Sequence, residues 1–174
     1  MPSGADDTDV VGLPLNDQVG SKLDYYLNTS VTTASAACTA EDRQVYRATM
    51  SLTNTVPAEQ VPSLRPSITG GDCRTLGLEK AEQRFAVFVY PPAGAALLDT
   101  QVNGESVAPT GHMDNGHPVQ VLWVRVKPGE TSTLSEDGLA PSPGESALEV
   151  DVTPTLSGVS RSSMPLGCAT IPLP

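Results

Sequence analysis

Hydrophobic and polar residues alternate one by one along several short segments of the chain. In the clearest of them, residues 45–56, the apolar side chains of Tyr46, Ala48 and Met50 are separated by polar ones. A period of two is typical of a β-strand with one buried face, because successive side chains of a strand point to opposite sides. Residues 84–92 are almost continuously apolar instead, which indicates a central strand.

The segment 117–127 also alternates and carries the strongest strand pattern. Trp123, the only tryptophan of the chain, lies two residues before Arg125, so both belong to the same face of this strand. A tryptophan can anchor a sugar or a partner protein at the surface, but within a strand that is otherwise buried it more often packs inside. We therefore expect Trp123 to be a core residue. Pro128-Gly129 then predicts the turn that ends the strand.

Turn residues divide the rest of the chain into further short strands. The pair Asn103-Gly104 predicts a two-residue hairpin, because both residues adopt positive φ at little cost. Strands are also expected over residues 23–38, which are rich in Tyr, Thr and Val, and over residues 147–156. Two segments rich in Gly, Pro and Ser are predicted to be loops: 138–146 and 157–167.

The composition agrees with an all-β domain. The 174 residues include 16 Pro and 15 Gly, which leave little room for long helices. About seven to eight strands with regular turn signals suit an antiparallel β-sandwich of immunoglobulin-like type. We expect residues 1–19 to be an acidic tail or linker with room for a short helical turn, and residues 20–174 to form a single β-sandwich domain.

The formal net charge of −10 argues against several classes of partner. Nucleic-acid binding needs clustered Lys and Arg, and lysine is scarce in this chain. The same acidity disfavours docking on an anionic membrane surface. No apolar stretch approaches the roughly 20 residues of a membrane span, and no signal peptide is visible. If the domain is exported, we expect the chain to be a fragment whose membrane anchor lies in a segment absent from it.

Three cysteines, Cys38, Cys73 and Cys168, lie too far apart for a C-x-x-C metal or redox motif. In an exported domain, one long-range disulfide with one cysteine left over fits better than a structural zinc site. We favour a disulfide between Cys38 and Cys168. A Cys38–Cys73 disulfide is the second choice, and three free thiols are the remaining alternative.

Both histidines lie in the stretch HMDNGHP, where His112, Asp114 and His117 form an H-x-D-x-x-H string. Imidazole and carboxylate groups are plausible zinc ligands. However, a five-residue spacing across an Asn-Gly pair fits neither the helical nor the strand arrangement of paired metal ligands. Asp, Asn and Gly together favour a turn that leads into the strand at 117–127.

No motif predicts catalysis or a cofactor. The acidic run at residues 6–9 lacks the glycine and the further ligands of a calcium loop, and we interpret it as part of a solvated tail. There is no G-x-S-x-G, no P-loop and no G-x-G-x-x-G, and spacing singles out no pair of carboxylates. We therefore expect no catalytic, cofactor-binding or metal-binding residues.

Six short motifs follow one another along the chain: KLDYYL (22–27), SLTNTVP (51–57), VFVYPPAGA (87–95), VNGESV (102–107), GHPVQVLWVRVKPGET (116–131) and VDVTPTL (150–156). In this order they resemble the C-terminal part of actinobacterial envelope proteins grouped as domain-of-unknown-function family 4012. The resemblance covers residues 20–156. The chain departs from the family at Asn103, where an Asp is usual, and at His117, where an Arg is usual.

The resemblance implies an extracytoplasmic location, a membrane helix elsewhere in the protein, and an oxidising compartment that favours a disulfide. It implies no catalytic residues, because the family has no established biochemical function. We therefore expect a non-catalytic module of a membrane-anchored cell-envelope protein, with a structural role or an interaction with cell-wall glycan or another envelope protein. Two alternatives stay open: an accessory or catalytic domain of an envelope polysaccharide-processing enzyme, and a metal-dependent adhesion module.

Overall fold

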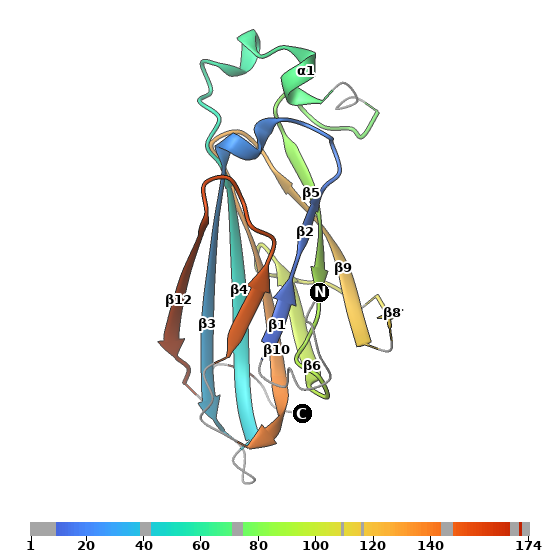
Figure 1. Ribbon diagram of the computed structural model, residues 1–174, viewed down its shortest axis with the longest axis vertical. Helices are drawn as coiled ribbons and strands as arrows, with labels where there is room; N and C mark the ends of the chain where they lie inside the picture. The colour runs from blue at the N-terminus through green and yellow to red at the C-terminus, as the bar shows by residue number, and fades with distance from the viewer. Residues whose placement is uncertain are drawn as a thin grey trace.

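The computed structural model describes residues 10–38, 43–70, 75–108, 110–115, 117–143, 148–167 and 171, and for residues 141–143 it describes the backbone alone (Figure 1). Within these residues the chain is all-β, as predicted, and its strands form three sheets. Three short helical turns lie together at one end of the molecule: η1 (Leu23–Tyr26), η2 (Val61–Ser63) and α1 (Pro66–Thr69).

The largest sheet has six strands, and their order across the sheet is β12 (Val159–Pro165), β3 (Leu27–Ala37), β4 (Arg43–Asn54), β10 (Thr131–Pro143), β6 (Ala96–Val102) and β7 (Glu105–Ser106). Neighbouring strands are antiparallel except β12, which runs parallel to β3. The hairpin predicted at Asn103-Gly104 is confirmed, since both residues have positive φ and join β6 to β7.

The second layer consists of two smaller sheets. The four-stranded one is antiparallel and contains β2 (Leu15–Asp17), β5 (Gln83–Val89), β9 (His117–Val126) and β8 (His112–Asp114). The two-stranded one pairs β1 (Val10–Leu13) in parallel with β11 (Glu149–Val152). Gly12 and Tyr90 exchange two backbone hydrogen bonds of 2.9 Å. This bridge places β1 beside the end of β5, so both small sheets belong to one layer (Figure 1).

The sandwich begins earlier in the chain than the expected residue 20. Residues 10–17 form β1 and β2, and the side chains of Val11 and Leu13 are fully buried in the core. Gly12 and Pro14 interrupt the apolar pattern here, which is why the sequence suggested a linker. The strand predicted over residues 23–38 starts later than expected, at Leu27, because η1 occupies residues 23–26.

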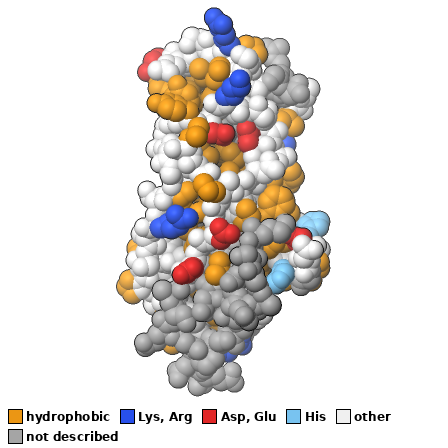
Figure 2. Space-filling view, in the orientation of Figure 1, with side chains coloured by type: hydrophobic (Ala, Val, Ile, Leu, Met, Phe, Trp, Pro, Cys, Tyr) orange, Lys and Arg blue, Asp and Glu red, His pale blue; other side chains and the backbone are white. Residues whose placement is uncertain are grey.

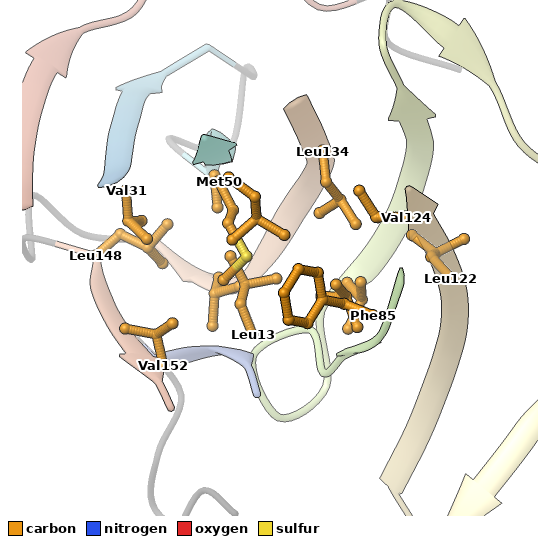
Figure 3. Packing of buried hydrophobic residues seen from close by; sticks show 14 of the residues in the cluster. Leu13, Val31, Met50, Phe85, Leu122, Val124, Leu134, Leu148 and Val152 are labelled. Atoms are coloured by element: carbon orange, nitrogen blue, oxygen red, sulfur yellow. The ribbon is translucent and has the colours of Figure 1, made fainter. Parts of the chain in front are cut away.

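The inward parity predicted for β4 is confirmed, whereas on β9 the buried parity is the one opposite to Trp123. On β4, Tyr46, Met50 and Leu52 are at most 1 % exposed, and on β9 the inward side chains belong to the parity of Leu122 and Val124. Figure 3 shows side chains from both layers meeting between the sheets, among them Leu13, Met50, Phe85, Leu134 and Val152. The core is therefore the space between two β-layers, as a sandwich requires.

Two segments predicted to be loops are strands in part. β10 continues through Gly138 as far as Pro143, and β12 occupies most of the segment 157–167. Gly138 has a packing reason, because a Cβ at this position would overlap the ring of Tyr46 on the neighbouring strand. On β12, six of the seven residues are exposed, so burial leaves no period-two pattern in the sequence.

Asn54 ties together one end of the sandwich. Its side chain is fully buried, and Nδ2 donates to the carbonyl oxygens of Ala81 at 2.9 Å and Val126 at 3.1 Å. Its Oδ1 accepts from the backbone N–H of Val56 at 3.2 Å. The backbone of Asn54 also exchanges hydrogen bonds with the turn at 129–130. Through these hydrogen bonds, Asn54 connects β4 with β9 and with the segment before β5.

Candidate functional site

Trp123 lies on the outer face of the smaller layer and not in the core. Its relative exposure is 52 %, so the prediction that it packs inside is wrong. On β9 it shares the outward parity with Val121 and Arg125. The sequence did contain the signal, because Arg125 and Lys127 stand at the same parity as Trp123 and charged side chains belong on the solvent face of a strand.

The indole is held in place by β5. Ala86, directly opposite Trp123 in the antiparallel register, is only 2 % exposed, and its small side chain leaves room for the indole. The guanidinium carbon of Arg84 lies 4.5 Å from the indole centroid, which is a cation–π contact. Phe88 and Val121 form the next opposed pair and are half-buried. We call these five residues the Trp123 face.

Ion pairs fix the rim of the Trp123 face. Arg125 donates from Nε to Glu82 Oε1 at 2.7 Å and from Nη2 to Glu82 Oε2 at 3.0 Å, and Lys127 Nζ lies 2.6 Å from Glu79 Oε1. Burial alone would raise the pKa of Glu82, but the hydrogen bonds from Arg125 and from the Glu79 N–H outweigh it and lower that pKa. Glu82 therefore stays charged and holds its segment against β9.

The stretch HMDNGHP forms β8, a turn and the start of β9, so the predicted turn is confirmed, with Asn115 at a φ of 50°. His112 lies on β8 and His117 on β9, and both are exposed. Asp114 Oδ2 accepts a hydrogen bond of 2.8 Å from the Tyr90 hydroxyl. Burial and this hydrogen bond raise the pKa of Tyr90 to about 12. Figure 2 shows the two histidines beside hydrophobic side chains on one flank. Through its hydrogen bond with the Tyr90 hydroxyl, Asp114 joins the β8–β9 hairpin to the end of β5.

Cys38 directly follows β3, while the other two cysteines lie outside the described residues, so both disulfide pairings stay predictions. Cys38 packs in one cluster with Leu166 and Ile171, which flank Cys168 in the sequence. The segment before Cys73 contains α1, at the opposite end of the molecule from the end of β3 (Figure 1). These positions favour Cys168 as the partner of Cys38.

A pocket of about 450 Å³ brings the carboxylates of Asp17 and Asp24 to one site. Asp17 is already engaged, because Oδ1 accepts from the Val19 N–H at 2.7 Å and Oδ2 from the Ser21 N–H at 3.0 Å. Partial burial, together with the charge of Asp17, raises the pKa of Asp24. Asp17 caps a turn and is not placed as an acid–base partner, so the pocket provides no ready catalytic pair. The acidic run at residues 6–9 lies outside the described part of the chain.

A carboxyl group and a phenol are buried together in the core. Tyr46 and Glu136 have no exposed surface, and the Tyr46 hydroxyl donates to Glu136 Oε1 at 2.6 Å. Burial raises the pKa of Glu136 to about 7, although the Tyr46 hydrogen bond lowers it, and the nearby charge of Asp137 adds to the rise. Within the described structure, Glu136 Oε2 and the opposite Thr100 Oγ1 have no hydrogen-bond partner. No substrate reaches this pair, so its role is structural.

Across the described ranges, no group of three His, Cys, Asp or Glu is arranged to hold a metal ion, and no helix has the length and apolar character needed to cross a membrane. Comparison with protein-family models, with curated proteins and with solved structures gave no match. The Trp123 face is therefore the feature of the described structure from which a function can be inferred.

Proposed function

We propose that this chain is a non-catalytic, extracytoplasmic binding module of a membrane-anchored cell-envelope protein, and that its Trp123 face binds cell-wall glycan. The observation that carries the proposal is a half-exposed indole on the outer face of a sheet, with the Arg84 guanidinium carbon 4.5 Å from its centroid. The apolar face of a sugar ring can stack on an indole, and the Arg84 and Arg125 guanidinium groups offer N–H donors to sugar hydroxyls beside it. The motif resemblance to family 4012 supports the envelope location.

Retention on insoluble cell-wall polysaccharide tests this proposal. Loss of the indole in Trp123→Ala is expected to weaken binding at least about tenfold, which corresponds to about 1.4 kcal/mol. Tyr25→Ala is the matched control, because Tyr25 is an aromatic side chain that is 71 % exposed on η1 and does not belong to the Trp123 face. Trp123 is also the only tryptophan, so bound glycan should shift its fluorescence directly. Equal retention of wild type and Trp123→Ala would contradict the assignment.

The same preparation separates the alternatives. Release of reducing ends from the polysaccharide, abolished by Asp24→Asn, would identify an enzyme that uses the Asp17–Asp24 pocket. Heat and a melting shift on addition of calcium or zinc would identify a metal-dependent adhesion module. Either result would replace the glycan-binding proposal.

A further inference from the structure

The strand β12 is an open sheet edge of unusual length for this molecule. The other strands at the ends of the described sheets have between two and four residues, whereas β12 has seven. Proteins commonly protect their edges by keeping them short or by placing lysine, proline or a bulge on them. The short edges here follow this practice, whereas β12 is longer and its one proline stands at its last residue.

The hydrogen-bond pattern defines which backbone groups of β12 are open. The Leu166 N–H donates to the Ser35 carbonyl on β3 at 3.4 Å. In a parallel ladder, alternate residues of a strand bond to the same neighbour, so Ser160, Ser162 and Met164 also direct their N–H and C=O groups toward β3. The odd-numbered residues from Val159 to Pro165 lie between these and direct their backbone polar groups away from β3, toward the open edge.

Nothing among the described residues covers this edge. Residues 160–165 are exposed, and β12 forms the outer margin of the six-stranded sheet in Figure 1. Figure 2 shows few charged side chains on this flank. Three of the side chains on β12 are serines, which allow another backbone to approach closely, and the strand carries no lysine. Pro165, with no N–H to leave unpaired, occupies an outward position at its end.

We propose that β12 is a strand-addition surface through which two copies of this chain pair, β12 against β12, in antiparallel orientation. The two-fold axis would pass beside Ser162. In this register Arg161 faces the partner's Ser163 on both sides of the axis, and each such pair exchanges two N–H···O bonds. A register centred on Arg161 would set two guanidinium groups opposite each other, and directly opposed like charges destabilise a pair of strands.

A second copy of the chain can supply the strand that adds to this edge. An added strand must be extended, unpaired along one edge and free of like charges opposite Arg161, and β12 of another copy meets all three conditions in the register centred on Ser162. One strand edge buries much less than the roughly 1,000 Å² of a stable interface. We therefore expect a reversible monomer–dimer equilibrium that appears only at high concentration.

Sedimentation velocity over roughly 10 µM to 1 mM, the range in which so small an interface would associate, tests the proposal. Wild type should shift toward the dimer as its concentration rises. Ser163→Pro removes an outward N–H and leaves the bonds to β3 intact, so it should stay monomeric, while the matched control Ser163→Ala should behave as wild type. Monomeric wild type over the whole range, or a Ser163→Pro dimer as strong as that of wild type, would overturn the proposal.

Cysteine cross-linking tests the register independently and does not rely on the proline variant being folded. Ser162 would face the partner's Ser162 at a Cα–Cα distance of about 4.5 Å, which a disulfide can span. Oxidised Ser162→Cys should therefore give a covalent dimer above the wild-type background. Ser160→Cys is the control, because its two copies would lie roughly 13 Å apart along the strands. A cross-link from Ser160→Cys alone, or from neither variant, would refute the register and the pairing.

Discussion

The buried carboxyl of Glu136 should make the protein less stable as the pH rises toward neutrality. Its pKa is raised from the ordinary 4.5 to about 7, chiefly because burial disfavours the carboxylate. In the unfolded chain the group regains its ordinary pKa, so between these two pH values the folded state holds a proton that the unfolded state has lost. Its contribution to stability is fully present below pH 4.5 and is lost as the pH rises to about 7.

The size of this effect follows from the two pKa values. At about 1.4 kcal/mol for each pKa unit, the difference between 4.5 and about 7 corresponds to about 3 kcal/mol of unfolding free energy. The replacement Glu136→Gln keeps the shape of the side chain and removes the titration. Relative to wild type, the variant should therefore gain about 3 kcal/mol between pH 4.5 and pH 8.

Urea unfolding of both proteins from pH 4.5 to pH 8 measures this difference, because other titrating groups affect both proteins alike. Glu82→Gln is the control whose stability difference from wild type should stay nearly constant over this pH range. The pKa of Glu82 is lowered, since hydrogen bonds from Arg125 and from the Glu79 N–H outweigh its burial, so its contribution is present above pH 4.5 and lost as the pH falls below that value. A stability difference between wild type and Glu136→Gln that does not change with pH would refute the reasoning.

Three further predictions concern packing and the covalent structure. Asn54→Ala should lower the unfolding free energy by about 2–4 kcal/mol in urea titrations, because two buried carbonyl oxygens lose the Asn54 donor and the buried Val56 N–H loses its acceptor. Gly138→Ala should cost about 1–3 kcal/mol because its Cβ would overlap a buried ring, whereas Gly111→Ala, with open space around it, should melt like wild type. Non-reducing peptide mapping should find Cys38 linked to Cys168, and three alkylated cysteines would contradict the disulfide.

Local patterns in the sequence predicted the strands with a buried face or a distinctive turn, and they failed for β12 and for the end of β10. The alternation in β4 and β9 reports burial directly, and Asn103 with its glycine reports a turn type. β12 has no buried face, so its position depends on a partner far away in the sequence. β10 carries Gly138 because of the Tyr46 ring, a reason that exists only in the folded protein.

The candidate site was harder to predict than the fold for a similar reason. The parity of Trp123 with Arg125 indicated solvent exposure, but the expectation for a lone tryptophan in an apolar strand outweighed it. The contact with Arg84 depends on the register of β5 against β9. No local rule of strand or turn formation fixes that register, so the stacked pair could only be found in the structure.

The pairing of β12 with β3 has a consequence for how the protein reaches its native state. Thr32 and Ser162 form a hydrogen bond across 130 positions of the chain. At ordinary rates of synthesis, β3 would wait on the order of 10 s for its outer neighbour to leave the ribosome. During that interval the edge of β3 is a template for incorrect strand pairing, and such distant contacts also slow folding. A nascent chain of this kind depends on protection from aggregation until its last strand arrives.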